Sequence, residues 1–195
     1  MRILVTGSSG WLGQTLVPRL KRDGHAVLGL DPEPGPTTAV VGSVVDRALV
    51  RRVVREHGIE AIVHAAARHK PHIETHDNSE FVAVNVQGTL NLLEEAVAPG
   101  SKVDRFVFTS TTSLMISQRI RDGKAGGAAE AVWIDETLSP LEPRNIYGVT
   151  KRAAEELCRL FHHLHRLPIL ILRTSRFFPE EDDMAHAIVQ SGENT

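Results

Sequence analysis

The chain has 195 residues, of which 42% are hydrophobic and 24% charged, and its formal net charge at pH 7 is −2. This length suits one α/β domain with a full core, and the balanced charge argues against a nucleic acid or an anionic membrane as partner. A lone cysteine, Cys158, excludes an intrachain disulfide and fits a reducing compartment. No apolar run reaches the ~18 residues of a membrane span, and a strand that starts at residue 2 leaves no room for a signal peptide. We expect a cytoplasmic protein.

The N-terminal residues carry a short apolar run, Ile3 to Val5, that meets three glycines with the spacing G-x-x-G-x-x-G: Gly7, Gly10 and Gly13. A strand that ends on glycines and opens a helix brings free backbone N–H groups and the positive end of a helix dipole to one point. A pyrophosphate binds well at such a point. Asp31 ends the next apolar run about 20 residues later, where a carboxylate can bind both hydroxyls of a ribose.

Strands and helices alternate along the rest of the chain. Apolar runs predict further strands at 26–30, 38–41, 61–66, 105–110 and 168–172. Apolar spacing predicts helices at 11–22, from an Asp46 cap to Gly58, from Asn78 or Ser79 to Val97, and at 147–165. Residues 111–144 are expected to be mostly loop, with a flexible tip at 123–127.

Strands that are apolar throughout indicate a parallel sheet with both faces covered. With right-handed crossovers, this predicts an α/β fold with a doubly wound parallel sheet, the Rossmann fold, in strand order 3-2-1-4-5-6. Ligands then bind where the strand order reverses, between the first and fourth strands. The carboxyl ends of the neighbouring strands carry Gly7, the run 65–67 and the run 109–111.

Tyr147 and Lys151 form a second motif. On a helix, residues four apart share one face, so the phenol and the ammonium are expected to point into the same cleft. A tyrosine, whose ordinary pKa is about 10, is a poor base at pH 7 unless a nearby cation stabilises its phenolate. Considered alone, this pair is more often an exposed helix pair.

Thr6-Gly7-x-x-Gly10-x-x-Gly13 together with Tyr147-x-x-x-Lys151 resembles the short-chain dehydrogenase/reductase superfamily, in its extended, nucleotide-sugar epimerase/dehydratase branch. The resemblance implies that Tyr147 moves the proton of a substrate hydroxyl and that Thr111 hydrogen-bonds this hydroxyl. Lys151 would hold the nicotinamide ribose and lower the pKa of Tyr147. The cofactor would be NAD rather than NADP, because the Asp31 carboxylate repels a 2′-phosphate.

The resemblance also implies a set of cofactor-binding residues: Gly7, Ser9, Gly10, Trp11, Leu12, Gly13, Asp31, Ser43, Val44, Ala65, Ala66, Ala67, Asn85, Tyr147 and Lys151. Substrate contacts would come from Arg68, Thr112 and Arg176, although an ion pair with Glu180, Glu181, Asp182 or Asp183 is the simpler role for Arg176. For Asn85, a packing role is as reasonable as cofactor binding.

Three departures from the family pattern narrow the function. Ser43 stands where the family has an Asp near the adenine, and Asp46 is a possible substitute. Thr112 and Ser113 replace the acids of sugar dehydratases and decarboxylases, so loss of water or carbon dioxide is disfavoured. Met115 replaces a tyrosine, which leaves a non-sugar carbonyl open as substrate. His69, His72 and His76 lack the companions of a metal site, and we expect a solvated loop and no metal.

We therefore expect an NAD-dependent epimerase-type enzyme that acts on a nucleotide-sugar hydroxyl through a transient keto intermediate. A reductase of a non-sugar carbonyl and a catalytically silent NAD-binding module are the alternatives. Residues 1–178 would form the NAD-binding domain, and residues 179–195 the start of a substrate-binding region that is largely absent. The two long helices resemble those through which related enzymes form homodimers, and the apolar residues that would contribute if they face outward are Phe81, Leu92, Leu157 and Leu164.

Overall fold

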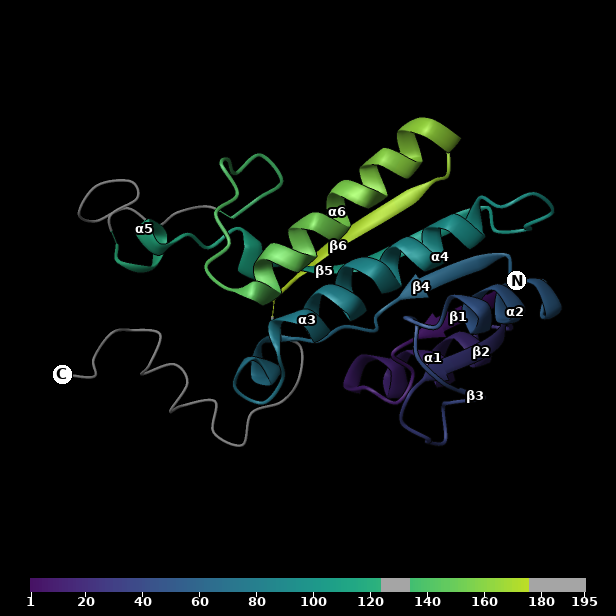
Figure 1. Ribbon diagram of the computed structural model, residues 1–195. Helices are drawn as coiled ribbons and strands as arrows, with labels where there is room; N and C mark the ends of the chain where they lie inside the picture. The colour runs from purple at the N-terminus through teal and green to yellow at the C-terminus, as the bar shows by residue number, and fades with distance from the viewer. Residues whose placement is uncertain (124–133, 176–195) are drawn as a thin grey trace.

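A six-stranded parallel sheet forms the centre of the molecule (Figure 1). The structure is a computed structural model and describes residues 1–123 and 134–175. The sheet order is β3-β2-β1-β4-β5-β6, and all pairings are parallel. The strands are β1 (Arg2–Thr6), β2 (Ala26–Asp31), β3 (Val40–Val41), β4 (Ala61–His64), β5 (Arg105–Thr111) and β6 (Ile169–Thr174). The predicted doubly wound fold is confirmed.

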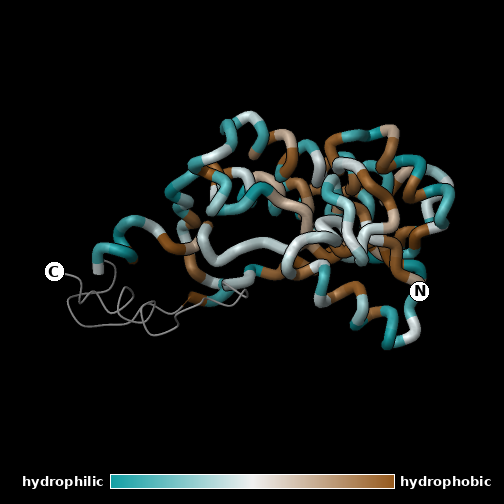
Figure 2. Tube along the Cα trace, turned by 90° about the horizontal axis from the view of Figure 1, so that it is seen from below, coloured by the Kyte–Doolittle hydropathy of each residue, from teal (hydrophilic) through white to brown (hydrophobic). Residues whose placement is uncertain are grey.

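Helices cover the two faces of this sheet unequally. One face carries α2 (Arg47–Glu56), α4 (Gly88–Ala96) and α6 (Ile146–His165), which bury the larger apolar cluster. The other face carries α1 (Trp11–Arg22) over a smaller cluster that includes Val5 and Val17. Figure 2 shows hydrophobic and hydrophilic stretches alternating along the chain. Cys158 is fully buried in the larger cluster, and no helix of the described residues has the length and apolar character of a membrane span.

The third strand is shorter than the sequence predicts. Residues 38 and 39 lie outside β3, and the Thr38 N–H is used in a turn, where it donates to the Gly35 carbonyl at 3.0 Å. Thr37 Oγ1 donates to the Ser8 carbonyl at 2.6 Å, and Thr38 Oγ1 lies 2.6 Å from Ser8 Oγ. A Cβ on Gly29 would lie only 1.9 Å from the Thr37 carbonyl oxygen, so only glycine permits this close approach.

The connection between β4 and β5 contains the clearest local difference from expectation. Instead of one regular helix, it has a 3₁₀ turn, η1 (Lys70–Glu74), then α3 (Asn78–Phe81), the π-helix η2 (Val82–Gln87) and α4. Asp77, without a side-chain capping bond, is the N-cap residue of α3, in place of the expected Asn78 or Ser79. By contrast, Asp46 caps α2 as predicted and accepts from the Leu49 N–H at 3.0 Å.

The π-helix directs the polar side chain of Asn85 toward the interior of the protein. Thr89 Oγ1 donates to the Asn85 carbonyl at 2.6 Å and so satisfies an acceptor in the widened turn. Asn85 is 1% exposed, and a Cβ on Gly88 would lie 2.5 Å from Val44 Cγ2. Single π turns inside α-helices often occur at functional sites. The apolar periodicity of the sequence could not predict this π turn, because one widened turn shifts the helical repeat only locally.

Glu155 is the centre of a buried ion cluster between α6, β5 and β6. The side chain is fully buried and accepts from Arg173 at 3.0 and 2.7 Å, from Ser110 Oγ at 2.6 Å and from Arg159 at 3.2 Å. Burial acts to raise the pKa of this carboxyl, but the hydrogen bonds from Arg173 and Ser110 outweigh it and hold the pKa below its ordinary value. The ionised cluster ties α6 to the edge of the sheet.

Replacement of Glu155 by Gln should therefore destabilise the fold, because it leaves the half-buried Arg173 guanidinium without its counter-charge. The expected loss is about 3–5 kcal/mol of unfolding free energy, measured by urea denaturation. Glu156→Gln is the matched control, since Glu156 is the exposed neighbour that pairs with Arg159. It should lower the unfolding free energy by less than about 1 kcal/mol. Equal effects of the two substitutions would contradict a structural role for the cluster.

Candidate active site

The glycine loop lies between the end of β1 and the start of α1. Gly7 has a φ of +72°, and a Cβ there would lie 2.7 Å from the Ala66 backbone nitrogen. A Cβ on Gly13 would lie 2.3 Å from the Gly7 carbonyl oxygen. Glycine is therefore required at both positions. The compact loop directs the N–H groups of the first turn of α1 into a cleft, which is the arrangement that binds a pyrophosphate.

Hydroxyl groups from the segment after β2 hold this loop in place. Ser9 Oγ donates to the Glu33 carbonyl at 2.7 Å and lies 2.6 Å from Thr38 Oγ1. Together with the bonds of Thr37 and Thr38 to Ser8, these contacts fix the loop from its outer side. Sequence reasoning missed this role. The one available signal was a pair of adjacent threonines directly after the proline-rich run 32–36.

Asp31 ends β2 next to the glycine loop and is 8% exposed. Its Oδ2 accepts from the Ser9 N–H at 3.1 Å, and its Oδ1 accepts from the Glu33 N–H at 2.9 Å. Each carboxylate oxygen keeps a second lone pair for a ribose hydroxyl. A 2′-phosphate would meet the charge of the carboxylate, so this geometry favours NAD over NADP.

A large open cleft of about 1690 Å³ runs along the carboxyl ends of the strands. Most of the predicted cofactor residues line it: Gly7, Ser9, Gly10, Trp11, Leu12, Asp31, Ser43, Val44, Ala65, Ala66, Ala67, Tyr147 and Lys151. Gly13 and Asn85 lie behind its wall. Asp46 does not line it either and uses its carboxylate to cap α2, so it does not replace the missing acid near Ser43. The shape and donor groups of the cleft fit a dinucleotide.

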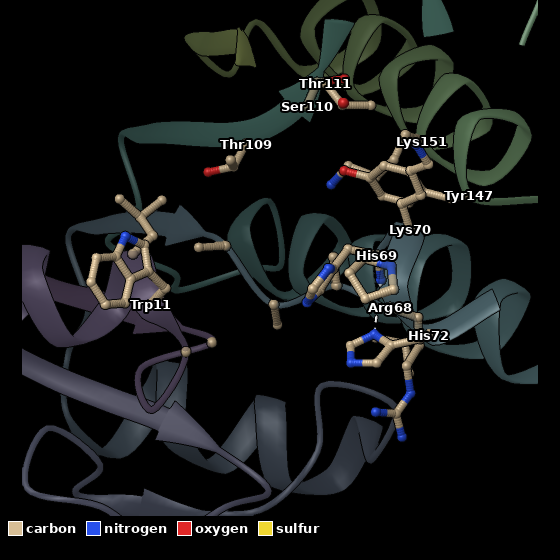
Figure 3. A pocket seen from close by; sticks show the side chains of 18 of the residues that line it. Trp11, Arg68, His69, Lys70, His72, Thr109, Ser110, Thr111, Tyr147 and Lys151 are labelled. Carbon is tan, nitrogen blue, oxygen red and sulfur yellow. Dashed lines mark hydrogen bonds between the residues drawn. The ribbon is translucent and has the colours of Figure 1, made fainter. Parts of the chain in front are cut away.

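The three predicted catalytic side chains meet at one end of this cleft (Figure 3). Thr111 is the last residue of β5, and Tyr147 lies in the first turn of α6, and both side chains line the cleft. Asn145 fixes the start of α6 by accepting from the Gly148 N–H at 2.9 Å. Lys151 follows one turn after Tyr147 on the same face.

Lys151 is almost completely buried, with 2% of its surface exposed. Its Nζ lies 4.1 Å from the centre of the Phe108 ring, a cation–π contact. Burial lowers the pKa of Lys151 to about 7, while Cys158 and Glu155 act in the opposite direction. The ammonium is therefore partly deprotonated near neutral pH.

Burial also raises the pKa of Tyr147, and the nearby Thr111 hydroxyl only partly offsets this effect. Without cofactor, the protein therefore raises the pKa of Tyr147, whereas we expected Lys151 to lower it. The physical reason is that desolvation disfavours a phenolate, and the lysine that was to stabilise it is itself largely desolvated.

The wall opposite Tyr147 consists of residues 68–74, a segment rich in basic and histidine side chains (Figure 3). Arg68, one of the predicted substrate residues, points its guanidinium away from Tyr147 and pairs with Glu80 at 3.1 Å. The rings of His69 and His72 lie 4.2 Å apart, and burial followed by the charges of His69 and Arg68 lowers the pKa of His72 to about 4.

The remaining substrate predictions have different outcomes. Thr112 lines the cleft, and its Oγ1 lies 3.5 Å from the Thr174 carbonyl oxygen. Arg176 falls outside the described residues. Within residues 1–123 and 134–175, no three His, Cys, Asp or Glu side chains are arranged to hold a metal ion. The site is thus a dinucleotide cleft with a hydroxyl, a phenol and a buried amine at one end.

Comparison with known proteins agrees with this geometry. The model of the NAD dependent epimerase/dehydratase family matches residues 3–191. A dTDP-glucose 4,6-dehydratase of Xanthomonas campestris pv. campestris (strain B100) is 29% identical, over 91% of this chain and 55% of its own length. A 3-beta-hydroxysteroid dehydrogenase of Mycolicibacterium neoaurum is 34% identical, over 80% of this chain and 42% of its own length. The chain thus spans about half the length of the curated relatives it matches.

A solved structure gives the same result. The UDP-glucose 4-epimerase of Thermus thermophilus, in complex with NAD, has a TM-score of 0.75 and 27% identity, and the match covers 89% of this chain and 54% of that one. The resemblance drawn from the glycine loop and from the Tyr147–Lys151 pair is therefore confirmed. The chain belongs to the NAD-dependent epimerase/dehydratase family of extended short-chain dehydrogenases/reductases, whose cofactor is NAD.

Proposed function

We propose that the protein is an NAD-dependent epimerase-type oxidoreductase that acts on a nucleotide-sugar hydroxyl through a transient keto intermediate. The observation that carries this proposal is the convergence of the Thr111 hydroxyl, the Tyr147 phenol and the buried Lys151 amine on the lining of one cleft. The relation to nucleotide-sugar enzymes, such as a UDP-glucose 4-epimerase and a dTDP-glucose 4,6-dehydratase, supports the substrate class.

In this proposal each of the three side chains has one task. Thr111 donates a hydrogen bond to the substrate oxygen and orients it toward Tyr147. Tyr147, as phenolate, accepts the proton of the hydroxyl, while bound NAD supplies reversible hydride transfer at the carbon that bears it. Return of the proton from Tyr147 to the keto oxygen, after the sugar has presented its other face, completes the epimerisation. Lys151 holds the nicotinamide ribose, and in its protonated form it also stabilises the phenolate of Tyr147.

The residues next to Thr111 support epimerisation over dehydration. Thr112 and Ser113 carry no acid, and loss of water from a keto-sugar needs a second proton-transfer group there. The acidic residues among the described residues that line the cleft are Asp31, Glu33 and Glu74, which come from the cofactor loop and the opposite wall.

A dehydrogenase of a non-sugar alcohol is the second candidate. The 34% identity to a 3-beta-hydroxysteroid dehydrogenase favours it, as does Met115 in place of a tyrosine. The chemistry at Tyr147 would be the same, but the product would be released as a ketone. A screen with NAD against UDP- and dTDP-hexoses and 3β-hydroxysteroids separates the two candidates, because only the second accumulates NADH in stoichiometric amounts.

Replacement of Tyr147 by Phe should lower turnover by roughly 10²–10⁴-fold, because the ring remains but the proton-transfer group is lost. Affinity for NAD, measured by calorimetry, should be retained. The assay uses the substrate that the screen identifies. Unchanged turnover would show that the motif is only a helix-surface pair, and absence of turnover in the native chain despite NAD binding would favour a silent NAD-binding module.

Replacement of Lys151 by Met should weaken NAD binding and yet stabilise the fold near pH 7. The folded pKa of about 7 lies below the ordinary 10.5, so the unfolded chain binds more protons between these values. The unfolding free energy of the native chain should therefore rise with pH across this window. In the variant this rise should be absent.

Urea denaturation at several pH values between about 7 and 10 measures this difference. Lys21→Met is the control, because Lys21 is exposed on α1 and should leave the pH dependence unchanged. A Lys151→Met variant that is less stable than the native chain at pH 7, or that keeps its pH dependence, would refute the buried-amine interpretation.

A homodimer through the α3–η2–α4 and α6 helices is part of the proposal. Phe81 and Leu92 are fully buried, so they contribute to the core and not to an interface. The exposed apolar residues on these helices are Val82 (47%), Val149 (49%), Leu160 (48%) and Leu164 (61%). Light scattering at micromolar concentration should give the dimer mass, and Leu164→Glu should give the monomer mass. A native monomer would refute the dimer.

A further inference from the structure

A buried polar network that was not identified from the sequence crosses the protein behind the wall of the cleft. It consists of Thr6 at the end of β1, His64 at the end of β4 and Thr89 in α4, none of which is more than 1% exposed. His64 Nδ1 lies 2.7 Å from Thr6 Oγ1, and His64 Nε2 lies 3.0 Å from Thr89 Oγ1. None of the three lines the cleft.

The neighbours of His64 determine the direction of both bonds. Thr6 Oγ1 accepts from the Ala66 N–H at 3.2 Å, so its own proton is available for His64 Nδ1. Thr89 Oγ1 gives its proton to the Asn85 carbonyl at 2.6 Å, so it can only accept from His64 Nε2. The imidazole is therefore neutral, with its proton on Nε2. The other tautomer would leave the proton of Thr6 without a partner and set two acceptors, Nε2 and Thr89 Oγ1, against each other.

Both ends of this network reach the walls of the cofactor cleft. At one end, Thr6 holds the Ala65 and Ala66 N–H groups through its carbonyl and its hydroxyl. At the other end, Asn85 accepts from the Arg68 N–H at 2.8 Å and donates to the Arg68 carbonyl at 2.9 Å. The segment 65–68, which lines the cleft, is thus held at one end by Thr6 and at the other by Asn85, the two ends of the network around His64.

The network also reaches the first turn of the catalytic helix. Asn85 Nδ2 donates to Thr150 Oγ1 at 3.0 Å, and this hydroxyl in turn donates to the carbonyls of Ile146 and Tyr147 at 2.9 and 3.0 Å. The position of Tyr147 relative to the wall 65–68 therefore depends on a continuous set of directional bonds.

The surroundings keep His64 uncharged. Its ring packs against Phe106 and Phe108 of β5, and Phe108 also carries the Lys151 amine on its ring. The groups that face His64 from β1 and α4 are the neutral hydroxyls of Thr6 and Thr89, and the charged group that acts on it is Lys151 from α6. Burial, followed by Lys151, lowers the pKa of His64 to about 3.

We propose that His64 is a positioning residue of the cofactor site, which in its neutral Nε2–H form sets the spacing between the glycine-loop strand, the wall 65–68 and the first turn of α6. His64 does not line the cleft, so it acts through the neighbours that do. The proposal concerns NAD binding, so it does not depend on which substrate the enzyme takes.

The test breaks the network at Thr89, where the shape of the side chain can be preserved. Thr89→Val removes the hydroxyl acceptor, and Thr89→Ser keeps it. We expect Thr89→Val to weaken NAD binding roughly tenfold, as for the loss of one buried hydrogen bond, and Thr89→Ser to bind NAD nearly as tightly as the native chain. Calorimetry with NAD gives both dissociation constants.

Val54→Ala controls for stability alone, because Val54 is 2% exposed in α2 and does not line the cleft. It should lower the melting temperature and leave NAD affinity unchanged. Equal NAD affinity for Thr89→Val and Val54→Ala would overturn the proposal. So would a failure of the native chain to bind NAD, whereas loss of turnover with intact NAD binding would affect only the proposed function.

A second measurement needs no substitution. Nitrogen-15 NMR of the imidazole rings reports which ring nitrogen carries the proton, and contacts to Thr89 assign the signal to His64. We expect the Nε2–H form, without titration near the ordinary histidine value of 6.5. A ring that is protonated on Nδ1, or that titrates near 6.5, would overturn the proposal even if every variant failed to fold.

Discussion

The structure depends on one close approach, between the glycine loop after β1 and the backbone at the end of β4. A Cβ on Gly7 would lie 2.7 Å from the Ala66 nitrogen, so no side chain fits between the two strands at this edge. Because the strand order reverses between β1 and β4, the helices that follow them diverge and open a cleft there. The closeness of the two backbones thus determines the position of the cleft, the position of residues 65–67 in its wall and the place where a dinucleotide can bind.

The inner face of α6 carries polar groups through the apolar core. Tyr147, Lys151 and Glu155 follow one another at four-residue intervals, from the cleft to the buried ion cluster. Glu155 is compensated by Arg173, whereas the contacts of Lys151 within residues 1–123 and 134–175 are the Phe108 ring and the more distant Cys158 and Glu155. A buried amine in such surroundings reduces the stability of the fold. Its position one turn from Tyr147 explains why a functional site would retain it.

The sequence was sufficient to predict the strand order, because that order follows from the alternation of strands and helices with right-handed crossovers. It also predicted the positions of the glycine loop, Asp31 and the Tyr147–Lys151 pair, because these depend on spacing within one element or between neighbouring elements. What the sequence did not predict depends on partners distant in the chain. His64 reads as one more residue of an apolar strand, yet it pairs with Thr6 and Thr89, 58 and 25 residues away. The π turn that orients Asn85 and the short β3 likewise result from contacts that no periodicity encodes.

Because Cys158 is buried, its reactivity reports the local separation of α6 from the sheet. Cys158 is the only cysteine of the chain, it is fully buried on the inner face of α6, and burial raises the pKa of its thiol to about 12. Thiol reagents attack the thiolate, which is almost absent while the helix stays on the sheet. Alkylation must therefore wait for α6 to separate from β5, so its rate measures the free energy of that separation without any introduced label.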